Sequence, residues 1–240
     1  MLTIIHCNLT SALAQSRRYN PSPNAPAPTT SRIGGTRTGS CSNTTSTTFT
    51  ALAPNSQVGR TAASHPTFVL YVPEGESLAI DFRLYQYDTD GQIQTPAVYQ
   101  TEISNAAGIM PITLPAAEPG LSVGEHYIWQ AALICNPARR ADDLIVEAEF
   151  QTVSDAVPES ERWYDLLKVA LDNAASDPQS IDELLTELSA LERSTGEALQ
   201  QAASTASESD RPSLEERSEA ALEQSLRYYS DCRGTLIALL

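Results

Sequence analysis

The chain has 240 residues, of which 41% are hydrophobic, 19% are charged and 6% are aromatic. This hydrophobic content is close to that of ordinary globular proteins, so the composition excludes a fully disordered acidic chain and predicts one or two folded domains. The net charge of −15 is uneven, because residues 1–73 carry +5 and residues 74–240 carry −20. A folded part this acidic repels phosphate groups, which argues against binding of nucleic acids or anionic membranes.

The first residues have features of a secretory signal. The apolar stretch Leu2–Ile5 is followed by small residues and by Ala12-Leu13-Ala14, the A-x-A pattern of a cleavage site. We therefore predict a signal peptide at residues 1–14. Because the basic start is missing and the apolar run is short, an ordinary disordered amino terminus is the alternative. No other apolar run approaches the roughly 20 residues of a membrane span, so we expect a periplasmic or secreted protein without one.

Residues 15–46 are rich in Pro, Ser, Thr, Asn and Gly and contain few apolar side chains. Such a composition cannot bury enough apolar surface to offset the entropy of folding. We predict a disordered tether over this range.

From Thr47 the sequence changes to short runs of β-branched and aromatic residues, separated by Pro, Gly, Asn or Asp. Strands are predicted at 47–53, 67–72, 78–87, 97–103, 109–114, 127–135 and 144–153. About seven short strands, with no helical pattern between them, favour an antiparallel β-sandwich of the immunoglobulin-like kind. We assign this domain to residues 47–157.

Residues 158–240 form an acidic region with a helical period, so the fold class is α+β with a small helical C-terminal part. The apolar set of the first helix starts at Trp163, and Asp177-Pro178 ends that helix. A capping box of Ser180 and Glu183 predicts the start of a second helix. After Gly196 and a polar stretch, a capping box that begins with Ser213 predicts a third helix, to about Tyr229.

The cysteines are compatible with one disulfide in an oxidising compartment. Cleavage after Ala14 would remove Cys7 and leave Cys41, Cys135 and Cys232. We favour a bond between Cys41 and Cys135, because the first opens the folded region and the second ends a predicted strand. Two reduced, buried cysteines are the alternative. The sequence has no C-x-x-C and its histidines are scattered, so we predict no metal site and no cofactor.

Short segments over about residues 34–167 carry a family resemblance through their order and spacing. They are Gly34-Gly35-Thr36-Arg37, Cys41, Thr50-Ala51-Leu52-Ala53-Pro54, His65-Pro66-Thr67-Phe68, Tyr71-Val72-Pro73, Gly124, Tyr127, Trp129, Cys135-Asn136-Pro137 and Trp163-Tyr164-Asp165. Together they resemble the cyanobacterial family known as domain of unknown function 928. The resemblance implies an exported protein with a β-rich core and a helical tail, supplies no activity, and adds weight to the pairing of Cys41 with Cys135.

Two motifs suggest chemistry, but their contexts do not support it. Gly120–Gly124 fits the G-x-S-x-G pattern of a nucleophilic serine at Ser122, yet a predicted strand containing His126 follows where a hydrolase needs a helix. We predict a polar turn. Asp88–Gly91 looks like the start of a calcium loop, but the twelfth position is Tyr99, which is not acidic, so a hairpin turn is predicted.

Four further residues are candidates for the core or for an interaction surface: His65, Trp129, Trp163 and Tyr164. Trp129 and Cys135 are six residues apart on one predicted strand, so they share a face of the sheet. His65 starts a strand without a nucleophile or metal spacing nearby, which favours a structural or surface role. We predict no catalytic residue.

These observations favour an exported, non-enzymatic protein that interacts with a protein partner or with the cell envelope. One alternative is a carbohydrate- or small-ligand-binding module, which an exposed row of Tyr85, Tyr87 and Tyr99 would favour. Another is a hydrolase that uses a carboxylate pair with shifted pKa values.

Overall fold

The structure is a computed structural model, and it describes residues 18–29, 41, 49–73, 78–104, 107–177 and 179–227. The predicted signal peptide, Cys232 and the predicted helix end at Tyr229 lie outside the described residues.

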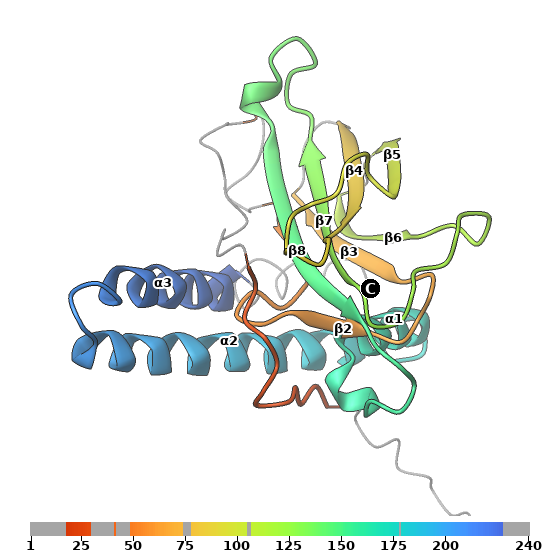
Figure 1. Cartoon of the computed structure of the whole chain (residues 1–240). Coiled ribbons are helices and arrows are strands. Elements are labelled where there is room, and N and C mark those ends of the chain that lie inside the picture. Colours follow the sequence, from red (N-terminus) through yellow and green to blue (C-terminus); the bar gives the residue numbers. More distant parts are fainter. Residues whose placement is uncertain are drawn as a thin grey trace, which may run out of the picture.

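The described strands form two sheets (Figure 1). The strands are β1 (Thr50–Ala51), β2 (Gly59–Thr61), β3 (Thr67–Val72), β4 (Ala79–Gln86), β5 (Tyr99–Ser104), β6 (Gly108–Thr113), β7 (His126–Leu133) and β8 (Leu144–Thr152). One sheet has the order β1-β3-β6 and the other has the order β2-β8-β7-β4-β5. Three helices follow in the described part of the chain: α1 (Trp163–Asn173), α2 (Gln179–Thr205) and α3 (Arg211–Arg227). The α+β class is therefore confirmed.

Each predicted strand has a counterpart in the structure, and β2 is an additional strand that the sequence analysis missed. At three residues, Gly59 to Thr61, β2 is too short to show an alternating pattern. It pairs in parallel with β8, with Gly59 opposite Phe150. The five-stranded sheet is therefore mixed, and the prediction of a purely antiparallel sandwich is wrong at this pair.

The two sheets face each other across an aromatic core. Phe68 of β3 lies 5.4 Å from Phe82, 5.6 Å from Trp129 and 5.3 Å from Phe150, measured between ring centroids. All four rings are fully buried. Large aromatic side chains that lose all contact with water contribute much of the stability of a small domain. Trp129 thus belongs to the centre of the core.

Neither predicted capping box caps a helix in the structure, because both helices begin ahead of the serine of the box. Ser180 lies inside α2, where its hydroxyl donates to the carbonyl of Ala170 (3.2 Å) and to that of Asp177 (2.8 Å). Ser213 likewise lies inside α3. The second helix also continues through Gly196 to Thr205, because tertiary packing of Gly196 outweighs its low helix propensity.

Residues 18–29 fall within the predicted tether, and here the structure differs from that prediction. Tyr19 is 8% exposed and its ring lies 5.0 Å from that of Trp163. Its backbone N–H donates to Glu187 on α2 (2.9 Å). Tyr19 is the only aromatic residue in the predicted tether, and its burial attaches this segment, drawn in red in Figure 1, to the folded part.

Cys41 and Cys135 form a disulfide, as predicted. The bond joins the chain ahead of β1 to the residues that follow β7. Within the described ranges, no helix combines the length and the apolar character needed to cross a membrane.

Candidate functional site

The candidate site is the pair of helices α2 and α3, here called the helical arm, together with its attachment to the sheets. Figure 1 shows the two helices side by side, extending past the edge of the sheets. The first half of α2 belongs to the main core through four buried residues. These are Ile181, Leu184, Leu185 and Leu188. Their spacing places them on one face of the helix.

Helix α1 is attached to the sheets through two indole hydrogen bonds. The indole N–H of Trp163 donates to the carbonyl of Leu52 (2.9 Å). The indole N–H of Trp129 donates to the hydroxyl of Tyr164 (3.0 Å). Burial raises the pKa of the Tyr164 phenol far above its ordinary range, so this group stays neutral. Gly59 permits the approach of Tyr164, because a Cβ at Gly59 would lie 2.7 Å from its ring.

The two helices of the arm pack closely because small residues lie between them. The hydroxyl of Ser189 donates to the carbonyl of Ser225, and that of Ser218 donates to the carbonyl of Gly196, each at 2.9 Å. A Cβ at Gly196 would lie 2.7 Å from Leu222. The arm is therefore held along its length by specific contacts.

A buried carboxyl group anchors the arm to the loop between β1 and β2. Glu192 of α2 has no exposed surface. Its Oε1 accepts hydrogen bonds from the backbone N–H groups of Asn55 (2.8 Å) and Ser56 (3.1 Å). Its Oε2 has no hydrogen-bond partner within the described part of the chain. Burial raises the pKa of Glu192 to about 7, and the backbone donors oppose this effect in part.

A second polar contact lies beside this anchor. The side-chain amide of Gln57 donates to the hydroxyl of Tyr19 (2.8 Å). Burial, followed by the nearby charge of Glu192, raises the pKa of Tyr19 beyond its ordinary range. The amino-terminal segment, the β1–β2 loop and α2 therefore meet at one buried polar cluster. Glu192 is a single carboxyl group there, and a hydrolase of the kind considered above needs a pair.

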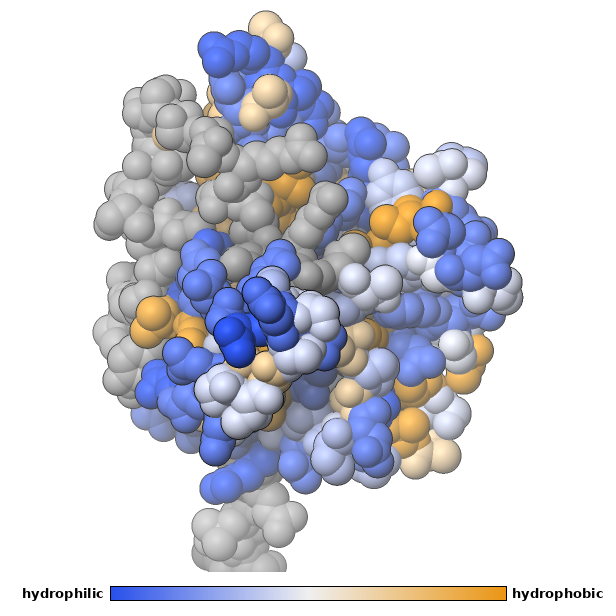
Figure 2. All heavy atoms as spheres, turned by 60° about the vertical axis from the view of Figure 1, so that its left-hand side comes forward, coloured by the Kyte–Doolittle hydropathy of each residue, from blue (hydrophilic) through white to orange (hydrophobic). Residues whose placement is uncertain are grey.

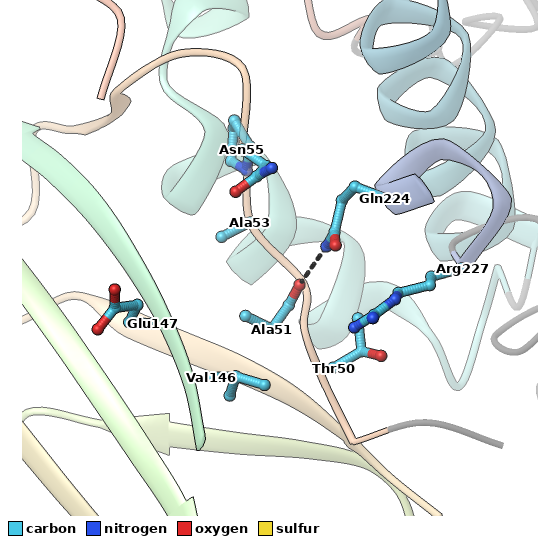
Figure 3. Close-up of a pocket in the computed structure, with 9 residues that line it drawn as sticks. Thr50, Ala51, Ala53, Asn55, Val146, Glu147, Gln224 and Arg227 are labelled. Atoms are coloured by element: carbon cyan, nitrogen blue, oxygen red, sulfur yellow. Dashed lines mark hydrogen bonds between the residues drawn. The ribbon is translucent and has the colours of Figure 1, made fainter. Parts of the chain in front are cut away.

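The attachment of α3 is equally close. Figure 3 shows Gln224 of α3 pointing toward the carbonyl of Ala51, to which its side-chain amide donates (3.4 Å). The cavity around this bond has room for about 10 Å³, and a neighbouring one lined by Asn55, Leu199 and Arg217 for about 20 Å³. Each holds at most about one water molecule. Among the described residues that line these two cavities, the junction is thus closely packed and leaves no room for a ligand larger than water.

A second buried carboxyl group, that of Glu149, lies on the outer face of the five-stranded sheet. Glu149 accepts from the hydroxyl of Tyr87 (3.1 Å) and from the backbone N–H of Thr29 (3.0 Å). The ring of His126 stacks on Tyr87 at 4.7 Å, and its Nε2 lies 3.2 Å from Glu149, outside hydrogen-bond alignment. The alternating pattern of β8 places Glu149 on the polar face of the sheet. That pattern does not predict that the segment around Thr29 covers Glu149.

The described strands all lie within the range that one family model matches. Residues 32–160 match the model of the family described as Domain of Unknown Function (DUF928), which is more than half of the chain. The chain belongs to this family. No curated protein and no solved structure matches it. The DUF928 match ends ahead of α1, although Trp163 and Tyr164 of α1 complete the core of the matched domain.

In this DUF928 protein, Ser122 lies exposed in the loop before β7. Its N–H donates to the hydroxyl of Tyr127 (3.3 Å), and its carbonyl accepts from the hydroxyl of Thr152. Strand β7 begins at His126, so a strand follows the motif, as the sequence predicts. His126 contacts Tyr87 and Glu149, as described above, and the structure does not bring it together with Ser122 as a catalytic pair.

The other candidate residues of the DUF928 protein, His65 and Asp88, form hydrogen bonds within loops and turns. The ring of His65 lies 3.1 Å from the Ser64 hydroxyl and 3.0 Å from the carbonyl of Glu118. Asp88 accepts from the N–H groups of Asp90 and Gln92, which closes a hairpin turn. Among the described residues, no three His, Cys, Asp or Glu side chains are grouped so that they could hold a metal ion.

The three tyrosines that would mark a carbohydrate-binding row do not form an exposed row. Tyr87 is buried, and Tyr99 packs against Phe82 at 6.3 Å between ring centroids. Tyr85 is partly exposed. A ligand site of this DUF928 protein therefore has to be sought in other residues.

Proposed function

We propose that this protein is an exported, non-enzymatic binding protein that presents its helical arm to a protein partner. The observation that carries the proposal is that the arm is fixed in the core at one end and extends past the sheets at the other (Figure 1). Such an arrangement offers a partner a preorganised surface, which lowers the entropic cost of association.

Charge indicates the chemistry of the partner. Residues 197–219, the outer part of the arm, carry six acidic and two basic side chains. The acidic residues are Glu197, Glu208, Asp210, Glu215, Glu216 and Glu219, and all are exposed. Where Figure 2 colours the residues by hydropathy, this face of the molecule is mainly hydrophilic, and its hydrophobic residues form small separate patches. We infer a partner with a basic surface, because complementary charge guides and orients association.

One observation supports export, and another supports an immunoglobulin-like sandwich. The bond between Cys41 and Cys135 would persist in an oxidising compartment such as the periplasm. The order β8-β7-β4 in one sheet, with β3 beside β6 in the other, corresponds to strands G-F-C and B-E of an immunoglobulin-like sandwich.

Site-specific photocrosslinking in the native organism tests the proposal. A photoreactive residue placed at Ser204 or Ser213, both exposed on the arm, should give a discrete adduct with one partner. The same residue at exposed Asp90, in the β4–β5 hairpin, is the matched control and should give none. Glu215→Lys combined with Glu219→Lys should abolish the adduct. Adducts of equal yield from Asp90, or an adduct that survives the charge reversal, would overturn the proposal.

A further inference from the structure

A hollow of about 350 Å³ lies on the outer face of the five-stranded sheet. Its lining comes from three strands and from the connection between β7 and β8. The lining residues are Asp81, Arg83, Gln130, Ala132, Arg140, Asp143 and Ile145. This volume is within the range of small-molecule sites.

The floor and the walls of the hollow differ in polarity. Ala132 of β7 and Ile145 of β8 are paired across neighbouring strands and give an apolar floor. Asp81, Arg83 and Gln130 surround it, because the register places Arg83 beside Gln130 and Asp81 beside Ala132. A ligand that fits must therefore have an apolar face and polar edges.

The charges of the walls are mutually neutralised. Arg83 donates to both oxygens of Asp81, at 3.2 and 2.7 Å. Arg140 donates to Asp143 at 2.5 Å and to Asp81 at 3.4 Å. An anion would have to compete with these carboxylates for the guanidinium groups. A cation would be repelled by the positive charges of Arg83 and Arg140. The hollow therefore favours a neutral ligand.

Hydrogen-bonding capacity nevertheless remains. The side chains of Arg83 and Arg140 are 41% and 48% exposed, so their guanidinium groups are accessible to a ligand. A guanidinium has five N–H donors, so the bonds above do not exhaust those of Arg83 or Arg140. A hydroxyl group both donates and accepts, and can satisfy a carboxylate and a guanidinium at once.

We propose that this hollow binds a neutral, polyhydroxylated ligand, namely a saccharide unit whose C–H face lies on Ala132 and Ile145. Its ring hydroxyls would bond to Asp81, Arg83 and Arg140. Such a unit is either a free monosaccharide or part of a glycan chain. The proposal is independent of the arm and of its partner.

Titration of the ¹⁵N-labelled chain by NMR tests this site. The probes are glucose, galactose and mannose as free sugars, soluble glucan and galactomannan as chains, and sulfate as an anion. We expect at least one neutral probe to shift the amide signals of Gln130 and Ala132, with a Kd of about 1 mM or tighter. Stronger binding of the chains would identify a glycan, and equal binding of their component monosaccharide would identify a free sugar.

Two variants locate the site. Ala132→Trp should fill the hollow, and Gln130→Leu should remove a polar wall, so each should weaken binding about tenfold or more. Gln151→Leu, on the same face of β8 but six residues from Ile145, is the matched control and should bind as the wild type does. If Ala132→Trp fails to fold, Gln130→Leu decides the location. Binding unchanged in Gln130→Leu, stronger binding of sulfate, or no binding of any neutral probe at about 10 mM would overturn the proposal.

Discussion

Glu192 is the residue at which the attachment of the arm depends most directly on protonation. Its carboxyl is fully buried and accepts two backbone hydrogen bonds, while no described residue donates to its second oxygen. In the folded state the pKa of Glu192 is raised to about 7. The folded state therefore binds the proton of this carboxyl group more tightly than the unfolded state does. Stability from this group is present below the ordinary pKa of a glutamate and is lost as the pH rises through about 7.

The first prediction concerns this loss of stability at higher pH. Between about pH 5 and pH 8 the free energy of unfolding of the wild type should fall by ~2 kcal/mol more than that of Glu192→Gln. The glutamine keeps a carbonyl acceptor for Asn55 and Ser56 and cannot ionise. Urea unfolding at several pH values measures the difference, and groups common to both proteins, such as Tyr19 and Glu187, cancel. Parallel pH profiles would contradict the prediction.

The second prediction concerns Gly196. Alanine favours a helix by about 1 kcal/mol over glycine. A Cβ here would nevertheless lie 2.7 Å from Leu222 and 3.2 Å from the carbonyl oxygen of Ser218. Overpacking of this kind costs about 1–3 kcal/mol, so Gly196→Ala should destabilise the chain by ~1 kcal/mol. Ser194→Ala, exposed on the same helix, is the control and should be neutral or slightly stabilising. An equally stable Gly196→Ala variant would show that the helices are not closely packed.

Single residues were the least predictable level of this structure. Gly196 carries a local signal that commonly marks a helix end, yet it lies inside α2 because packing against α3 outweighs that signal. The burial of Tyr19 and Glu192 depends on contacts with segments far away in the sequence. No periodic pattern contains that information.

At the scale of elements, the disulfide is the strongest single link between distant segments. It closes a loop with a sequence separation of 94 residues. In the chain-entropy model such a link stabilises by ~4–5 kcal/mol through the unfolded state.

The third prediction is that reduction lowers the melting temperature by about 10 °C, since 1 kcal/mol corresponds to a few degrees in a protein of this size. Cys232→Ser should respond like the wild type. Cys41→Ser should melt low under both conditions and show no further change on reduction. Peptide mapping without reductant checks the connectivity, and a bond between Cys135 and Cys232 would contradict the prediction.

The elements themselves were largely predictable, because strands and helices have their own periods. The alternation in 78–87 predicts β4, and the apolar stripe that begins at Trp163 predicts α1. Strand β2 was not predicted, because its three residues are too few to show an alternating pattern. They are a strand only through their pairing with β8. The hollow could not be predicted either, since it needs Asp81 and Asp143 to come together through the register of three strands.

At the scale of the whole molecule, the sheets, α1 and the arm form a continuous structure. The main core runs from the aromatic rings between the sheets to Leu188 on α2. Glu192 and Gln224 then attach the two helices of the arm to the chain around β1. This continuity is what makes the arm a fixed surface, and the proposed function depends on it.

The most direct test of this claim is the distance distribution between spin labels on the arm and on the sheets. Labels at Ser204 and Glu102, both exposed, would be measured by double electron–electron resonance in a chain whose Cys7 and Cys232 are replaced by serine. A label pair within the sheets, at Glu102 and Gln151, gives the width expected for a rigid body. We predict a single narrow distribution for the arm, as narrow as that of the control pair. A broad or multimodal distribution for Ser204 would contradict the account, because the arm would then be a flexible appendage.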